Sequence, residues 1–181
     1  MLKKVTTGAL ALFLALGMAT GVRALSADTA KPAAPAAADS AKEKPKPGGA
    51  TLEELGAKMC KAGETANADA LIDLFSPPMV ESLKQYAPMI MGEDSKDPWA
   101  DFKGQIQADM QANPLVKCSL KEASEIECAE ESVKKFEGSQ YKIGKCGTIT
   151  MSTQMKDAEE VDDEILHTMM FDGRWYMNED M

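Results

Sequence analysis

Histidine is almost absent from this chain, and so are the other usual marks of catalysis. His167 is the only histidine in 181 residues, so acid–base or metal chemistry near neutral pH would depend on that one side chain. The sequence also lacks a Ser-His-Asp pattern, a glycine-rich phosphate loop and a recognisable pair of carboxylates. We therefore expect a protein that is not an enzyme, with no cofactor and no metal site. A hydrolase or isomerase that uses His167 is the alternative.

Positive charge and long apolar runs are scarce in most of the chain. Residues 51–181 hold 13 of the 20 Lys and Arg but 26 of the 29 Asp and Glu, a net charge of −13. Such a field repels phosphate backbones, which excludes nucleic-acid binding through a basic patch. Beyond the first residues, the best apolar run is 85–92, far short of the roughly 20 residues of a membrane span. We expect no membrane span once the leader described next is removed.

The chain begins with the features of an export signal. Lys3 and Lys4 are followed by an uncharged, mostly apolar stretch at 8–19, and Leu25-Ser26-Ala27 offers a small-residue cleavage site. This order is typical of a secretory signal peptide, which we place at residues 1–27. We therefore expect a periplasmic or secreted protein.

A low-complexity stretch follows the leader. In residues 28–50, Ala, Pro and Lys make up 16 of 23 residues, with no aromatic or large aliphatic side chain. Such a segment cannot bury enough apolar surface to offset the entropy of ordering it. We therefore expect a disordered linker at 28–50 and one folded domain at 51–181.

The first half of that domain has helical periodicity. Thr51 and Glu54 fit a capping box, and apolar residues then recur at helical spacing as far as Ala62. Further helices are expected over 66–75, from Ser76-Pro77 to a limit at Pro88, and from Asp97-Pro98 to Asn113-Pro114.

The second half has the period of β-strands. Strands are expected over 115–120, from Tyr141 to Met155, over 164–171 and over 174–178, with a short helix within 124–136. Asp172-Gly173 predicts a tight turn, because both positions favour positive φ. The fold class is therefore α+β, with N-terminal helices packed on an antiparallel sheet.

Two segments resemble a known superfamily. Residues 67–77 (NADALIDLFSP) and 171–177 (FDGRWYM) are similar to the early helical segment and the final hairpin of nuclear-transport-factor-2-like, cystatin-like cone domains. Many exported bacterial domains of unknown function share this fold. The resemblance implies a curved sheet around a helix, leaving a cone whose mouth can hold a ligand. The family's enzymes place a carboxylate, a tyrosine or histidines inside the cone, and no such set aligns here beyond His167.

Strand alternation supplies candidate residues for that cone. The pocket candidates are Ile149, Met151, His167, Met169 and Trp175, with His167 and Met169 sharing a face with Ile165 and Phe171. The expected function is the binding of a small apolar ligand in the cone, or of a protein partner through the sheet or a Met-rich helical face.

The four cysteines are expected to form two disulfides, because their number is even and an export signal precedes them. Of the three pairings, we favour Cys128–Cys146 with Cys60–Cys118. A redox or metal role would call for Cys-x-x-Cys spacing, which is absent.

Methionine is abundant, with 13 residues in the chain. Thioethers can bind Cu(I) in an exported protein, and Met89, Met91, Met169, Met170 and Met177 are the candidates for such copper handling. Methionine also fills irregular cores and adaptable apolar surfaces, which is the alternative interpretation.

Overall fold

The computed structural model describes residues 46–92, 94–156, 158 and 160–178. The predicted signal peptide and most of the predicted linker lie outside the described residues. The helices are α2 (Leu52–Glu64), α3 (Ala68–Ile72), α4 (Pro77–Met91), α5 (Pro98–Ala112) and α6 (Glu130–Lys134). The strands are β1 (Leu115–Ile126), β2 (Ile143–Met155), β3 (Asp162–Phe171) and β4 (Arg174–Met177). This is the predicted α+β order.

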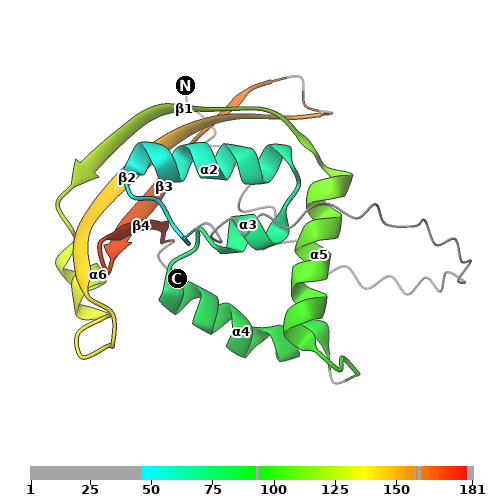
Figure 1. The fold of residues 1–181 in the computed structure, drawn as a ribbon, viewed down its shortest axis with the longest axis horizontal. Coiled ribbons are helices and arrows are strands. Elements are labelled where there is room, and N and C mark those ends of the chain that lie inside the picture. Colours follow the sequence, from blue (N-terminus) through cyan, green and yellow to red (C-terminus); the bar gives the residue numbers. More distant parts are fainter. Residues whose placement is uncertain (1–45, 93, 157, 159, 179–181) are drawn as a thin grey trace, which may run out of the picture.

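The strands form a four-stranded antiparallel sheet in the order β1-β2-β3-β4. The sheet curls around α2, which lies along its concave face, while α3, α4 and α5 extend away from it (Figure 1). The main core fills the space between α2 and this face. Its buried members include Leu55, Ile149, Leu166, Trp175 and Met177.

Helix α2 begins where its capping residues predict. The Thr51 hydroxyl accepts a hydrogen bond from the Glu54 backbone N–H at 3.1 Å. The Glu54 carboxylate accepts one from the N–H of Ala50 at 2.8 Å and pairs with Lys58 at 2.8 Å. These contacts satisfy backbone donors at the start of the helix and place negative charge at its N-terminus, which fixes where α2 starts.

The other face of the sheet carries a second, smaller core at one end. Met169, Phe171 and Tyr176 are buried there with the Cys128–Cys146 disulfide, under the segment that contains α6. The ring of Phe136 meets that of Phe171 edge-on, with centroids 5.4 Å apart. Both faces of β3 therefore carry buried apolar side chains near its C-terminal end.

The folded contacts begin before Thr51, inside the segment predicted to be linker. Gly49 pairs with Trp175 of β4 through two backbone hydrogen bonds of 2.8 Å. Lys58 and Arg174 both donate to the carbonyl oxygen of Gly48, at 2.7 and 2.9 Å. The segment covers part of the outer edge of β4, a position that would otherwise expose unpaired backbone groups.

Glycine is required at this crossing. Gly48 has φ +67°, and a Cβ there would lie 2.6 Å from the Trp175 carbonyl oxygen. A Cβ on Gly49 would lie 2.6 Å from the backbone nitrogen of Leu55. The pair can therefore pass between α2 and β4 only because it has no side chains.

Helix α5 is joined to the α2–α3 corner. Gln107 donates to the carbonyl of Ala66 and accepts from the N–H of Ala68 at 3.0 Å, so one side chain satisfies two backbone groups of that corner. Lys103 of α5 also pairs with Asp69 of α3 at 2.7 Å. These contacts hold the C-terminal half of α5 beside the end of the sheet.

Three predicted boundaries differ from the structure. Helix α4 continues through Pro88 to Met91, and Gly92 follows it with φ +85°. The 66–75 helix is shorter than expected, since only Ala68–Ile72 is α-helical. Strand β1 runs on past Leu120 to Ile126, with a register shift between Leu120 and Glu122.

Candidate functional site

A pocket is lined by residues at the end of the sheet where α5 leads into β1. Figure 1 shows this junction of α5 and β1. The cavity has a volume of about 80 Å³. It is lined by residues of α2, α3, α5 and the three longest strands: Met59, Gly63, Leu71, Met110, Asn113, Leu115, Cys118, Met151, Thr153, Met155, Glu164 and Leu166. Concave, mostly apolar sites with a few polar groups are where small ligands usually bind.

Four methionines from three different elements meet at this pocket. Met59 comes from α2, Met110 from α5, and Met151 and Met155 from β2. Met110 and Met151 are buried, with 5% and 2% of their surface exposed. Unbranched, polarizable thioether side chains adapt to ligands of different shape, so this lining suits an apolar ligand.

One wall of the pocket is held covalently. Cys60 of α2 and Cys118 of β1 form a disulfide that spans 58 residues of sequence. It fixes α2 against β1 beside Met59 and Leu115. The wall is also close-packed at Gly63, where a Cβ would lie 2.6 Å from Cδ2 of Leu115.

Polar lining groups come from segment ends at the edge of the pocket. Glu164 and Thr153 lie on the concave face of β3 and β2, where Met151 pairs with Glu164 and Thr153 with Asp162. Asn113 follows the last residue of α5, and its side-chain nitrogen donates to the Asp109 carbonyl at 3.3 Å. The pocket thus has an apolar floor and a polar edge.

The sequence-based candidates fall into two groups in the structure. Met151 lines the pocket. Ile149 and Trp175 share its face of the sheet but are buried in the main core, 0% and 2% exposed. His167 and Met169 lie on the opposite face: His167 is exposed, and Met169 belongs to the second core. The structure therefore does not bring the five candidates together.

The copper candidates are also separated. Met89 is 79% exposed on α4. Met169 and Met170 point to opposite faces of β3, because neighbouring residues of a strand alternate. Met177 is 1% exposed in the main core. Within the described ranges, no three His, Cys, Asp or Glu side chains are grouped so that they could hold a metal ion.

The sequence reasoning missed most of the pocket. Met59 and Met110 are buried on the apolar sides of α2 and α5, but helical spacing alone does not say which residues of two helices meet. Met155 lies on the same face of β2 as Met151, as strand alternation requires. The signal that could have indicated the pocket was the occurrence of methionines on this face of β2 and on the apolar sides of α2 and α5.

Among the described residues, hydrogen bonds shift the pKa values of two partly exposed ionisable groups, Glu54 and Tyr141. A hydrogen bond from Lys58, followed by one from the Ala50 amide, lowers the pKa of Glu54. A hydrogen bond to Glu81 raises the pKa of Tyr141. Both groups lie outside the pocket lining, and we assign them structural roles.

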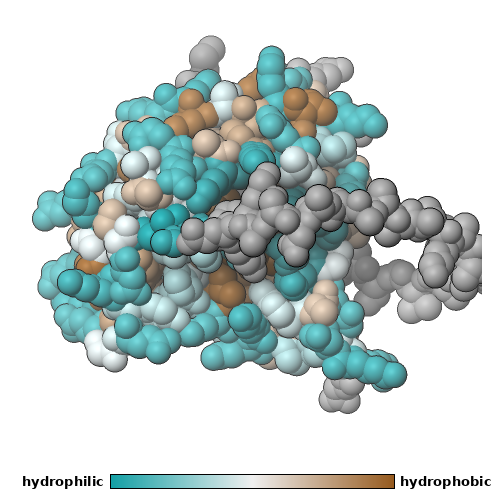
Figure 2. Space-filling model, in the orientation of Figure 1, coloured by the Kyte–Doolittle hydropathy of each residue, from teal (hydrophilic) through white to brown (hydrophobic). Residues whose placement is uncertain are grey.

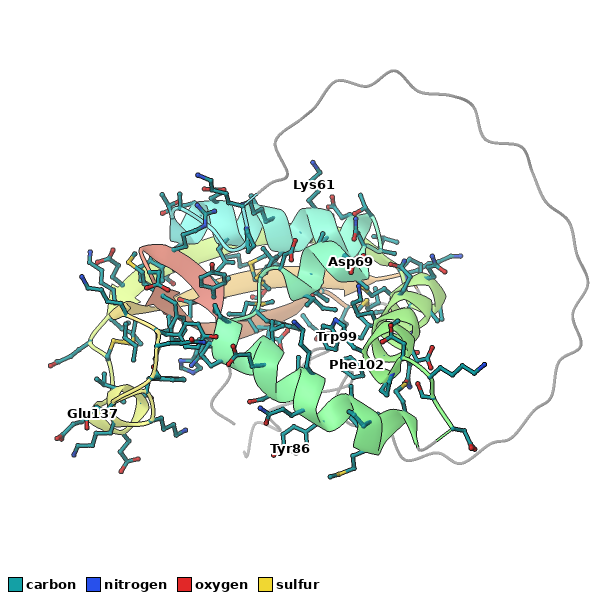
Figure 3. All side chains as sticks on the ribbon, turned by 60° about the horizontal axis from the view of Figure 1, so that its bottom comes forward. Lys61, Asp69, Tyr86, Trp99, Phe102 and Glu137 are labelled. Carbon is teal, nitrogen blue, oxygen red and sulfur yellow. A yellow bond between two sulfur atoms is a disulfide. The ribbon has the colours of Figure 1, made fainter. Side chains whose placement is uncertain are left out.

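Most of the surface in the view of Figure 2 is hydrophilic, and its hydrophobic patches are small and separate. One exposed apolar group lies on α4: Tyr86, Met89 and Ile90 are 54%, 79% and 46% exposed. On the neighbouring α5, Trp99 and Phe102 stack with their centroids 5.7 Å apart (Figure 3). Tyr86 points away from that stack in the same view.

Comparison with known proteins supplies no relative: no protein-family model, curated protein or solved structure matches this chain. Among the residues that the structure covers, no helix is both long enough and apolar enough to cross a bilayer.

Proposed function

We propose that this chain is an exported, disulfide-linked binding domain that takes a small, largely apolar ligand into the pocket between α2, α5 and the sheet. The observation that carries the proposal is the pocket lining, where four methionines and three leucines surround an open space. The leader-like first residues and the two disulfides support a periplasmic or secreted location.

The resemblance to nuclear-transport-factor-2-like domains fits this proposal. A curled antiparallel sheet around one helix, with a pocket at one end, is the arrangement that the resemblance implies. Because one fold carries many functions, the proposal depends on the pocket rather than on the resemblance.

A pocket-filling substitution tests the proposal. The probe is 1-hexanol, and isothermal titration calorimetry measures its binding to the mature protein. Gly63→Leu adds a side chain at the pocket wall, against the flexible end of Leu115. We expect saturable binding to the unchanged protein and a loss of about tenfold or more in the variant.

The matched control is Gly104→Leu, also a helical glycine, where an added Cβ would meet nothing within 4 Å. It should bind 1-hexanol like the unchanged protein. Absence of saturable binding to the unchanged protein, or equal binding by Gly63→Leu, would overturn the proposal.

The rival function is an enzyme of the same fold that uses His167. Its exposed position on the face away from the pocket argues against that role. His167→Gln should leave 1-hexanol binding and any biological phenotype nearly unchanged. Loss of the phenotype with intact ligand binding would favour the enzyme.

A second binding mode is suggested by α4. Its exposed Tyr86, Met89 and Ile90 form an apolar group of the kind found in protein interfaces. We propose this group as the contact for a protein partner. Met89→Lys should abolish a partner interaction there and leave 1-hexanol binding unchanged.

A further inference from the structure

We infer that the ligand of this pocket is an unbranched hydrocarbon chain, which enters with its methyl end first and leaves its polar end at the end of the sheet. The inference rests on the proposed function and narrows it to a chemical class. Three observations support it: the direction in which the lining becomes buried, the close approach of α2 to β1, and the volume of the cavity.

The pocket has a buried inner end and a more exposed outer end. Along β2, Met151 is 2% exposed, whereas Thr153 and Met155 are half-buried. All three residues line the pocket, and with a rise of about 3.3 Å per residue they extend over about 13 Å along the strand. A ligand that enters at the end of the sheet therefore meets Met155 first and Met151 last.

The main core closes the inner end. Ile149 precedes Met151 on the same face of β2, and Leu55 lies one helical turn before Met59 on α2. Ile149 and Leu55 are both 0% exposed and belong to the main core. Figure 1 shows α2 lying along the concave face of the sheet, so the helix and the strands enclose this end from two sides. The pocket is thus a channel with a closed end, which limits the length of chain that it takes.

The channel is bounded on one side by the close approach of α2 to β1. The Cα atoms of Cys60 and Cys118, which form the disulfide, are 5.2 Å apart. Farther along α2, a Cβ on Gly63 would lie 2.6 Å from Cδ2 of Leu115. Because helix and strand already touch at these two points, a ligand extends along the strands rather than sideways between α2 and β1.

The volume of the cavity favours a chain over a compact molecule. It is about 80 Å³, whereas an apolar cavity that holds a benzene ring has a volume of about 150 Å³. A straight chain can fill the smaller space with its first carbons while the rest of the ligand stays at the outer end. The unbranched thioether side chains of Met59 and Met151 can adapt to such a flexible chain.

The outer end suits the polar end of the ligand. Asn113 and Thr153 line the pocket there, and their uncharged amide and hydroxyl groups can form hydrogen bonds. Asn113 is exposed and Thr153 is half-buried. The polar group of a chain can therefore be bound at this end without leaving water completely.

The first test compares the length and the shape of neutral alcohols, with affinities measured calorimetrically on the mature protein. From 1-butanol to 1-hexanol, affinity should rise about fourfold for each added methylene. From 1-hexanol to 1-octanol and 1-decanol it should then rise by about twofold or less, because the added methylenes stay outside the cavity. Cyclohexanol and 3,3-dimethyl-1-butanol, which also have six carbons, should bind about tenfold more weakly than 1-hexanol.

The second test moves the closed end. Met151→Ala removes side-chain atoms there, so 1-octanol should bind about tenfold more tightly than 1-hexanol in this variant. Met151→Val is the milder variant, and it should shift the ratio of the two affinities in the same direction. The matched control is Met89→Ala, which removes the same side chain from an exposed site on α4 and should leave the ratio unchanged.

A third arm distinguishes a free chain from the chain of a lipid. Lysophosphatidylcholine with a six-carbon acyl chain should bind like 1-hexanol if lipid chains enter the pocket, and more weakly if the pocket takes only free chains. If the compact alcohols match 1-hexanol, if affinity rises without a limit to 1-decanol, or if Met151→Ala behaves like Met89→Ala, the chain assignment fails and the pocket stands. If no alcohol binds saturably, the proposed function fails as well.

Discussion

At the scale of single residues, two adjacent glycines matter more than their place in a low-complexity segment indicates. Gly48 and Gly49 cross between α2 and β4 at distances that exclude a Cβ. Lys58 and Arg174 donate to the carbonyl of Gly48, so helix and strand are both tied to the crossing. The sequence alone could not show this, because glycine at the end of an Ala/Pro/Lys stretch is typical of a linker.

A pair of Gly→Ala substitutions tests this role. Gly49→Ala should lower the free energy of unfolding by about 1–3 kcal/mol, because its Cβ would overlap backbone atoms of Leu55 and Thr51. Gly104→Ala should raise it by about 0.5–1 kcal/mol, since Ala favours the helix and the site is open. Urea denaturation measures both values. A neutral or stabilising Gly49→Ala would contradict the role given to this crossing.

At the scale of elements, the N-terminus of α2 is fixed by side chains as well as by packing. Glu54 accepts from the Ala50 amide and pairs with Lys58. The capping box was predictable, because Thr51 and Glu54 are at the required spacing. The structure differs in one detail: the carboxylate takes the N–H of Ala50, one residue before Thr51.

Glu54 also predicts a pH dependence. Its pKa is lowered from the usual 4.5 in the folded state, chiefly by the hydrogen bond from Lys58. A carboxyl with a lowered folded pKa stabilises the protein above its unfolded pKa, and this contribution disappears as the pH falls through the folded pKa. The difference in Tm between the unchanged protein and Glu54→Gln should therefore be fully present at pH 7, begin to shrink as the pH falls below 4.5, and vanish once the pH is below the lowered folded pKa. A difference that stays constant down to acid pH would contradict this assignment.

The elements themselves could largely be predicted. Caps at Thr51 and Asp97, the Asn113-Pro114 stop and the Asp172-Gly173 turn act through local geometry, and the structure confirms them: Asp172 and Gly173 have φ +50° and +79°. The end of α4 was missed because Pro88 is tolerated inside this helix. The end of β1 was missed because charged side chains hide its alternation beyond Leu120, on a strand at the edge of the sheet.

The prediction of which face of β3 lines the pocket was wrong, and it changed the candidate site more than any boundary did. Apolar residues occupy both its faces near Phe171, since the segment around α6 covers the convex side. Alternation then gives two apolar series, and the sequence does not say which of them faces α2. The series with His167 and Met169 was assigned to the pocket, whereas Glu164 and Leu166 line it.

At the scale of the whole molecule, the two disulfides hold opposite faces of one sheet. Cys60–Cys118 joins α2 to the concave side, and Cys128–Cys146 joins the α6 segment to the convex side. Both are the pairs favoured from the sequence. Their sequence separations are 58 and 18 residues, so their effects on the unfolded chain differ.

Replacing each cysteine pair by alanine should separate the two roles. Loop-closure entropy predicts a loss of about 4 kcal/mol for Cys60–Cys118 and about 3 kcal/mol for Cys128–Cys146. Only the first bridge borders the pocket, so only its removal should also weaken 1-hexanol binding. Urea denaturation and calorimetry measure the two effects. Weaker binding after loss of Cys128–Cys146 alone would show that the faces are coupled.

The central claim is that the methionine-lined space at the end of the sheet is the binding site. Methyl-¹³C methionine NMR during titration with 1-hexanol tests it directly, because the methionines report on different parts of the molecule. We predict saturable shifts of the Met59, Met110, Met151 and Met155 methyl signals, with Met89 and Met169 unmoved. Shifts confined to Met89 or Met169, or four pocket methyl signals that do not respond to 1-hexanol, would contradict the account.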